Sequence, residues 1–159
     1  MKRIFIILSS ILLLIGINSC TKQNNVWLVS IGESKASVKQ ALDKEKIKYT
    51  DQDTAINIET SIKYLDIDWN KISISFENNV TTSVLFQKLE GPALSKEQKK
   101  IVVYQFDDIY GDHKYDKSTE YGLSGWSWDK NGTIVSFMSI LKGQYAMLLV
   151  CKKKDKKSE

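Results

Sequence analysis

The sequence predicts an α+β domain in which one antiparallel sheet has two helices packed on one of its faces. Two amphipathic segments follow serines that can cap a helix, and runs of alternating apolar and polar residues follow each segment. The turns between these runs are too short for the crossover connections of a parallel sheet. We therefore expect one domain over residues 26–151, built from two similar units (26–90 and 94–151) of one helix and three strands each.

The first unit begins with VWLVSIG (26–32), which predicts a short strand, and continues with a helix expected within 33–49. Either Ser34 or Ser37 can cap this helix. Its narrow apolar stripe consists of Val38, Ala41 and Leu42. Strand-like segments follow at 55–59, 64–69, 71–77 and 82–88. The ENNV turn between the last two predicts a hairpin.

The second unit begins with a capping box formed by Ser95 and Gln98, and its helix is expected to end at Gly111. The apolar face of this helix consists of Val102, Phe106, Ile109 and Tyr110. Strands are expected at 122–129, 133–140 and 144–151, joined by turns at Asn131-Gly132 and Lys142-Gly143. Alignment of the two units matches Trp69 with Trp128, so we expect both tryptophans in the core.

Residues 1–19 have the features of a bacterial secretory signal. Lys2 and Arg3 precede an apolar run that is shorter than the roughly 20 residues needed to span a bilayer. The run leads to Ile-Asn-Ser-Cys20, which resembles the lipobox of bacterial lipoproteins. The resemblance implies that the leader is cut before Cys20 and that this cysteine is acylated, which anchors the chain effectively irreversibly. The alternative is an ordinary signal peptide followed by a chance cysteine.

The lipobox interpretation also predicts the roles of the segments that flank the domain. Residues 20–25 form a short tether, so the body is expected close to the membrane, and 152–159 is a Lys-rich flexible tail. Thr21, rather than Asp, follows the cysteine, which resembles an outer-membrane destination in a bacterium with two membranes, and we favour its periplasmic face. If Cys20 is acylated, Cys151 keeps the one thiol of the mature chain, and we expect it to be a small buried hydrophobe.

The stretch IGESKASVKQAL (31–42) resembles the opening of small envelope lipoproteins of the SmpA/OmlA and beta-lactamase-inhibitor-like group. Gly32, Ser34, Val38 and Leu42 match the Gly, Ser or Thr, Val and Leu that recur there before a hairpin sheet. The family commonly continues with Gly and Pro, whereas Asp43 and Lys44 follow here. The resemblance implies a non-enzymatic binding or scaffold module and carries over no catalytic residue.

The residue types that support catalysis are scarce. His113 is the only histidine, so histidine metal clusters and histidine-assisted nucleophiles lack their parts. The only arginine is Arg3 in the leader, which argues against nucleic acid as a partner. Asp66 and Asp68 alternate with apolar residues and indicate a solvated strand face, and GDHKYD (111–116) indicates a flexible loop. We expect no enzyme, no cofactor and no metal.

Aromatic surface is the remaining functional signal. Trp126 and Trp128 share one face of a predicted strand, and Tyr145 begins a last strand that is apolar on both faces. Trp126 and Tyr145 are the candidate partner-binding residues, whereas Trp128 is expected in the core. We expect a monomeric, lipid-anchored envelope module that binds a protein partner as an assembly accessory or inhibitor. The alternative is a carbohydrate- or small-ligand-binding lipoprotein that uses the aromatic face, and an enzyme ranks third.

Overall fold

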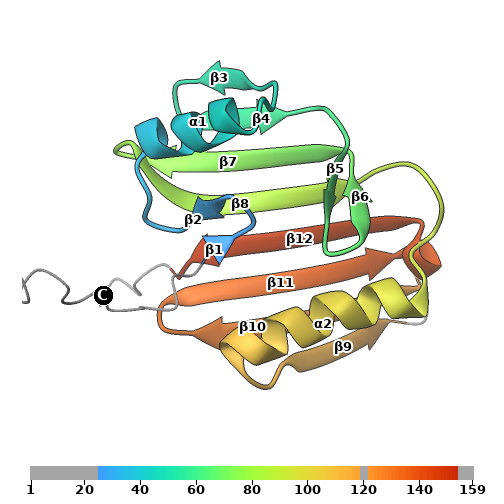
Figure 1. Ribbon diagram of the computed structural model, residues 1–159. Coiled ribbons are helices and arrows are strands. Elements are labelled where there is room, and N and C mark those ends of the chain that lie inside the picture. Colours follow the sequence, from blue (N-terminus) through green and yellow to red (C-terminus); the bar gives the residue numbers. More distant parts are fainter. Residues whose placement is uncertain (1–24, 119–121, 154–159) are drawn as a thin grey trace, which may run out of the picture.

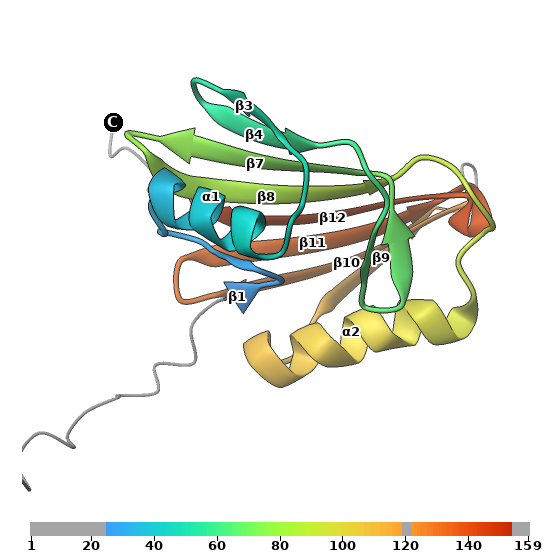
Figure 2. The same cartoon turned by 45° about the horizontal axis from the view of Figure 1, so that its top comes forward.

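The computed structural model of the protein describes residues 25–118 and 122–153. The predicted signal peptide (1–19), Cys20 and residues 154–159 of the predicted tail lie outside the described residues. The described chain forms one large antiparallel sheet with two helices on the same face (Figures 1 and 2). This confirms the predicted α+β class with an antiparallel sheet.

The elements follow one another in a simple order along the chain. They are β1 (Asn25–Val26), β2 (Val29–Ser30), α1 (Lys35–Lys44), β3 (Thr50–Gln52), β4 (Ala55–Ile58), β5 (Ile62–Tyr64), β6 (Ile67–Trp69), β7 (Lys71–Glu77), β8 (Val80–Lys88), α2 (Lys96–Tyr110), β9 (Lys114–Ser118), β10 (Leu123–Lys130), β11 (Thr133–Ile140), the 3₁₀ turn η1 (Leu141–Gly143) and β12 (Tyr145–Lys152).

The main sheet has eight strands in the order β3-β4-β7-β8-β12-β11-β10-β9. Strands from the first half of the chain lie together on one side, strands from the second half lie on the other, and the halves meet where β8 pairs with β12. The predicted arrangement of one helix and three strands per unit is not found, because each half contributes four strands to this sheet.

The sheet ends on both sides in strands that the sequence did not predict, β3 and β9. β3 reads TDQ and β9 reads KYDKS, so neither has an apolar face that alternation could reveal. β9 occupies part of the segment 111–116, which was expected to be a loop. Polar and charged side chains on an edge strand hinder pairing with another chain. The polar composition that made β3 and β9 hard to predict from sequence therefore suits their position at the sheet edges.

Two segments that were expected to be single strands are divided by tight turns. The segment 26–32 forms the end of β1 and all of β2, which pair around Trp27, whose φ is 62°. The segment 64–69 turns at Leu65 and Asp66, both with positive φ, so that β5 and β6 pair as a separate hairpin. Trp69 therefore lies outside the main sheet, unlike Trp128, with which the sequence alignment matched it.

The helix starts agree with the capping signals. Ser34 is the N-cap of α1, and its hydroxyl accepts a hydrogen bond from the Ser37 backbone nitrogen at 3.2 Å. Ser95 caps α2, and both hydrogen bonds of the predicted capping box with Gln98 are present. α2 ends at Gly111, whose φ of 84° is in the region that glycine adopts without a side-chain clash.

The core fills the layer between the sheet and the elements that cover it. Both helices contribute buried side chains, namely Val38 and Leu42 from α1 and Val102, Phe106 and Tyr110 from α2. Phe86 of β8 lies at the centre, where its ring contacts those of Trp27, Tyr64 and Trp69. Trp69 and Trp128 are 0% and 2% exposed, so the prediction that both belong to the core is confirmed.

Candidate functional site

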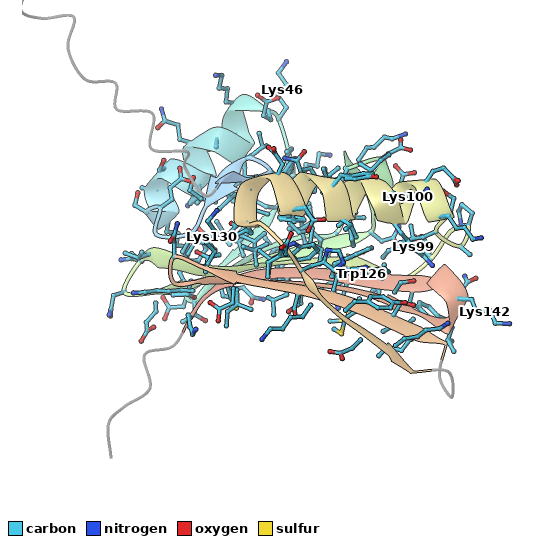
Figure 3. All side chains as sticks on the ribbon, turned by 90° about the horizontal axis from the view of Figure 1, so that it is seen from below. Lys46, Lys99, Lys100, Trp126, Lys130 and Lys142 are labelled. Carbon is cyan, nitrogen blue, oxygen red and sulfur yellow. The ribbon has the colours of Figure 1, made fainter. Side chains whose placement is uncertain are left out.

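A groove lies between α2 and the β9–β10 side of the sheet, and we call it the α2 groove. Its volume is about 440 Å³, within the roughly 300–1,000 Å³ that small-molecule sites occupy. Its lining consists of Lys96, Lys99, Lys100, Val103, Tyr104, Asp107, His113 and Trp126. Figure 3 shows Lys99 and Trp126 between the helix and the sheet. One of the two predicted partner-binding residues therefore lies in a cavity of ligand size.

One stripe of α2 supplies most of the groove. Its members, spaced three or four residues apart, are Lys96, Lys99, Lys100, Val103, Tyr104 and Asp107. At a rise of 1.5 Å per residue, the stripe from Lys96 to Asp107 is roughly 16 Å long. The adjacent stripe of the helix carries Val102 and Phe106 into the core. α2 therefore packs on the sheet with one stripe and leaves the next one for the groove.

Trp126 is held in a row of aromatic rings that crosses the strands. In the sheet register it is opposite Phe137 of β11 on one side and Tyr115 of β9 on the other. Both ring centroids are 5.2 Å from that of Trp126. The Phe137 ring is stacked on that of Trp126, with 22° between the two ring planes, and the Tyr115 ring is tilted by 45°. One ring face of Trp126 is thus already covered, which leaves less aromatic surface for the stacking of a sugar. Its indole nitrogen forms no hydrogen bond with another described residue, unlike that of Trp128.

A hydrogen-bonded cluster closes one end of the α2 groove. Trp128 Nε1 donates to Oδ1 of Asp107 at 2.8 Å, and His113 Nδ1 lies 2.9 Å from the same oxygen. The His113 ring also contacts the Trp128 ring, with centroids 5.8 Å apart. Burial alone would raise the pKa of Asp107, but the hydrogen bonds with His113 and Trp128 outweigh it and lower that pKa. Asp107 is therefore ionised at neutral pH.

This cluster connects α2 with the segment that follows it. The His113–Asp107 pair fixes that segment and places His113 against Trp128. The groove lining contains no serine, threonine or cysteine beside the pair. The expectation that 111–116 is a loop is wrong from Lys114 onward, where β9 begins, and His113 before it is hydrogen-bonded to α2.

The opposite end of the groove is positively charged. Lys96, Lys99 and Lys100 lie in the first two turns of α2, and within residues 25–118 and 122–153 no ion pair neutralises them. A cation in the first turn of a helix, such as Lys96, is disfavoured by the helix macrodipole, an effect that falls off beyond that turn. The sequence thus places three positive charges that do not stabilise the start of α2 beside an apolar cavity. Positions where a local rule is broken are often functional.

The sheet face opposite the helices is the second candidate surface. It is open: Figures 2 and 3 show both helices on the other side, and Figure 2 shows the β5–β6 hairpin there as well. Its centre, which we call the open face, consists of Ser83, Leu85, Gln87, Ile134, Ser136, Met138, Ile140, Tyr145, Met147, Leu149 and Cys151. None of these side chains is charged. Apolar side chains meet across β11 and β12, for example Met138 beside Met147.

The two predicted partner-binding residues lie on opposite faces of the sheet. Trp126 is on the helix-covered face, in register with Phe137 and Leu148. Tyr145 is on the open face, beside Ile140, and is 38% exposed. The structure therefore does not bring Trp126 and Tyr145 into one site. Each belongs to one of the two candidate surfaces.

Two further residues singled out in the sequence, Cys151 and Asp66, occupy places that differ from the expected ones. Cys151 is half-buried on the open face rather than buried in the core, and burial raises the pKa of its thiol. Asp66 does not share a strand face with Asp68, because it lies in the β5–β6 turn and pairs with Lys63 at 3.2 Å. Both aspartates are exposed, as expected.

The described residues contain neither a candidate metal site nor a candidate membrane-spanning helix. No group of three His, Cys, Asp or Glu side chains there is arranged to hold a metal ion. In that part of the chain no helix is both long and apolar enough to cross a membrane.

Sequence reasoning did not identify the lysines and Tyr104 as site residues. Tyr104 is 71% exposed, although it lies between the buried Val102 and Phe106 in the sequence. The available signal was the spacing of Lys96, Lys99 and Lys100 with Val103 and Tyr104, which defines a second stripe beside the core stripe. Which strand that stripe faces could not be known without the β9–β10 pairing.

Comparison of the chain with protein-family models, with curated proteins and with solved structures finds no match.

Proposed function

We propose that the protein is an envelope lipoprotein, anchored through Cys20, whose folded body binds a protein partner on the open face without catalysing a reaction. The observation that carries the proposal is the composition of that face. Three central strands, β8, β12 and β11, present it without a single charge, and most of its side chains are apolar. Depletion of charge is the feature that distinguishes the core of a protein–protein interface from the remaining surface.

The dimensions of the open face suit a folded partner. Strands about 4.8 Å apart and about eight residues long, at about 3.3 Å per residue, give a patch of roughly 15 by 26 Å before its neighbours are included. Together with the outward side chains of β7 and β10, which add charged residues such as Lys71 and Asp129 at its margins, this approaches the roughly 800 Å² per partner of a standard interface. A bilayer surface is a poorer match, because anionic headgroups attract lysines and the open face has none.

The place where the described chain enters the domain is compatible with a membrane-anchored domain whose open face stays accessible. β1, where the described chain begins, lies on the helix-covered side (Figure 2). A tether as short as 20–25 therefore places the helix-covered side nearest the membrane and leaves the open face accessible. The lipobox resemblance at Cys20 supports the anchor, and Thr21 supports an outer-membrane destination. No acidic run follows Cys20, which favours the periplasmic face of that membrane.

Site-specific photo-crosslinking in cells tests whether the open face binds a partner. A photoreactive residue at Met138 or Leu149, both on the open face, should give a discrete adduct with one envelope protein. The matched controls are Ile101 and Leu141, which are 40% and 54% exposed apolar residues outside this face, and they should give no such adduct. Equal adducts from all four positions would refute the proposal that the open face binds a partner. An adduct between two copies of this chain would show that the open face mediates self-association instead.

Introducing a charge into the open face gives a second test. Leu149→Lys places a cation at the centre of the open face and should abolish the adduct formed at Met138. Ile101→Lys introduces the same charge on α2 and should leave that adduct unchanged. Because both positions are solvent-accessible, neither variant is expected to unfold the domain, which circular dichroism checks.

The anchor is tested separately. Cys20→Ser should abolish lipid labelling and release the protein into the soluble fraction, or leave an uncut precursor, because no thiol remains there for the diacylglyceryl group. Recovery of a correctly processed variant in the membrane fraction at the wild-type level would contradict the anchor. This outcome would leave the docking face untouched, since the two proposals depend on different residues.

A further inference from the structure

We propose that the α2 groove binds a single-chain anionic amphiphile, with its anionic head among Lys96, Lys99 and Lys100 and its apolar chain beside Val103 and Trp126. The site lies on the helix-covered side of the sheet, so the inference does not depend on the protein partner proposed for the open face. The charges of the groove, the order of residues along it and its volume all match such a ligand.

The charges of the groove require an anion and give it a direction. The three lysines form one end, and no described residue forms an ion pair with them. The other end is the carboxylate of Asp107, whose acceptor oxygen already binds Trp128 and His113. An anionic head is attracted to the lysine end and repelled from the Asp107 end.

The middle of the groove requires an apolar group. Between its two charged ends the lining is formed by Val103, Tyr104 and Trp126. The Trp126 ring is stacked on Phe137, and the Tyr115 ring lies against it at a tilt of 45°. A flexible chain can pack beside a ring that is partly covered in this way, whereas a sugar or a nucleobase needs a free aromatic face to stack on. The stripe of α2 along which this chain would lie is roughly 16 Å long.

The volume of the groove restricts the ligand to one chain. About 440 Å³ is in the lower part of the range of small-molecule sites, roughly 300–1,000 Å³. A two-chain phospholipid cannot be enclosed in this space. The class that satisfies charge, length and volume together is therefore a carboxylate or phosphate monoester with one aliphatic chain.

Octyl phosphate is a suitable probe for the full chain, labelled with ¹⁵N-tryptophan and held in nanodiscs of zwitterionic lipid. The readout is the indole N–H resonance of Trp126, assigned by its absence in Trp126→Phe. Octyl phosphate should shift this resonance and leave that of Trp128 almost in place, because the Trp128 nitrogen is bound to Asp107. Octanol, octyltrimethylammonium and inorganic phosphate, which lack the anionic head, invert its charge or lack the chain, should cause little shift.

Two variants with the same change of net charge separate the site from general electrostatics. Lys96→Gln/Lys99→Gln/Lys100→Gln should weaken octyl phosphate binding about tenfold or more, as expected when three partly screened charges are lost. Lys44→Gln/Lys46→Gln/Lys48→Gln removes three exposed lysines in and after α1, far from the groove (Figure 3 marks Lys46), and should change binding less than about twofold. Glutamine has nearly the helix propensity of lysine, so both variants should fold.

Three results would overturn the proposal. One is equal binding of octanol or octyltrimethylammonium, which would show that the anionic head is not recognised. Another is equal weakening by the two triple variants. The third is a Trp126 shift that appears only when anionic two-chain lipid is added to the nanodisc, which would assign the lysines to the bilayer surface instead.

Discussion

The hydrogen bond between Trp128 and Asp107 provides the sharpest test of how the helix-covered side is held together. Trp126 and Trp128 lie two residues apart on the same face of β10, so Trp126→Phe and Trp128→Phe are the same chemical change in neighbouring places. Trp128 is 2% exposed and donates to a carboxylate at 2.8 Å. Trp126 is half-buried, and its indole nitrogen has no described partner.

The expected magnitudes follow from these environments. Trp128→Phe loses a hydrogen bond to a charged group, about 1.5–3 kcal/mol, and leaves part of the ring volume empty, about 1–2 kcal/mol more. Trp126→Phe loses only some apolar contact, about 1 kcal/mol. The free energy of unfolding should therefore fall by about 2 kcal/mol more for Trp128→Phe than for Trp126→Phe.

Urea unfolding monitored by far-ultraviolet circular dichroism measures both variants without relying on tryptophan fluorescence. A double-mutant cycle of Trp128→Phe with Asp107→Ala then isolates the pair, and its coupling energy should be at least about 1 kcal/mol. Equal destabilisation by the two tryptophan variants, with no coupling to Asp107, would refute the reasoning and reduce Trp128 to ordinary apolar packing.

Three further outcomes are expected. Asp107→Asn should remove part of the acid destabilisation: the lowered pKa of Asp107 means that the unfolded chain takes up the proton first, so wild-type stability is lost as pH falls below about 4, and an unchanged acid limb would contradict this. Gly143→Ala should cost about 2 kcal/mol more than Gly91→Ala in urea unfolding, because both have positive φ but only the Gly143 Cβ would meet backbone atoms of Leu94, at 3.0 Å. The melting temperature should be the same with and without reductant, because Cys151 is the one thiol left once Cys20 is acylated; a drop of several degrees would reveal a disulfide.

The elements that the sequence predicts well are those whose local chemistry is complete. Ser95 and Gln98 form the capping box of α2, and Gly111 ends the helix, because these signals act within a few residues. The β7–β8 and β10–β11 hairpins also follow from alternation and turn residues, such as Asn131-Gly132. In these places the local preference and the final fold agree.

The parts that the sequence did not predict depend on distant contacts. β3 and β9 become strands because a neighbour offers a free edge, and their own side chains give no alternation. The α2 groove exists because β9 and β10 lie beside the lysine stripe of α2, and this placement depends on tertiary structure. The same limit applies to Trp126 and Tyr145: their exposure could be proposed from sequence, but their opposite faces follow only from the β10–β11–β12 register.

The pairing of β8 with β12 has a consequence for how the chain acquires its structure. Ala146 pairs with Lys88 and Cys151 with Ser83, so the central seam of the sheet joins positions that are far apart in sequence. Every other pairing of the main sheet lies within one half, and such local pairings form faster than distant ones. During synthesis, both half-sheets can therefore begin to form before β12 is complete, and the edges of β8 and β11 stay unpaired until that last strand is added. A chain truncated before Tyr145 would leave the edges of β8 and β11 unpaired. Because unpaired edges pair with other chains, we expect such a chain to aggregate rather than only to lose the open face.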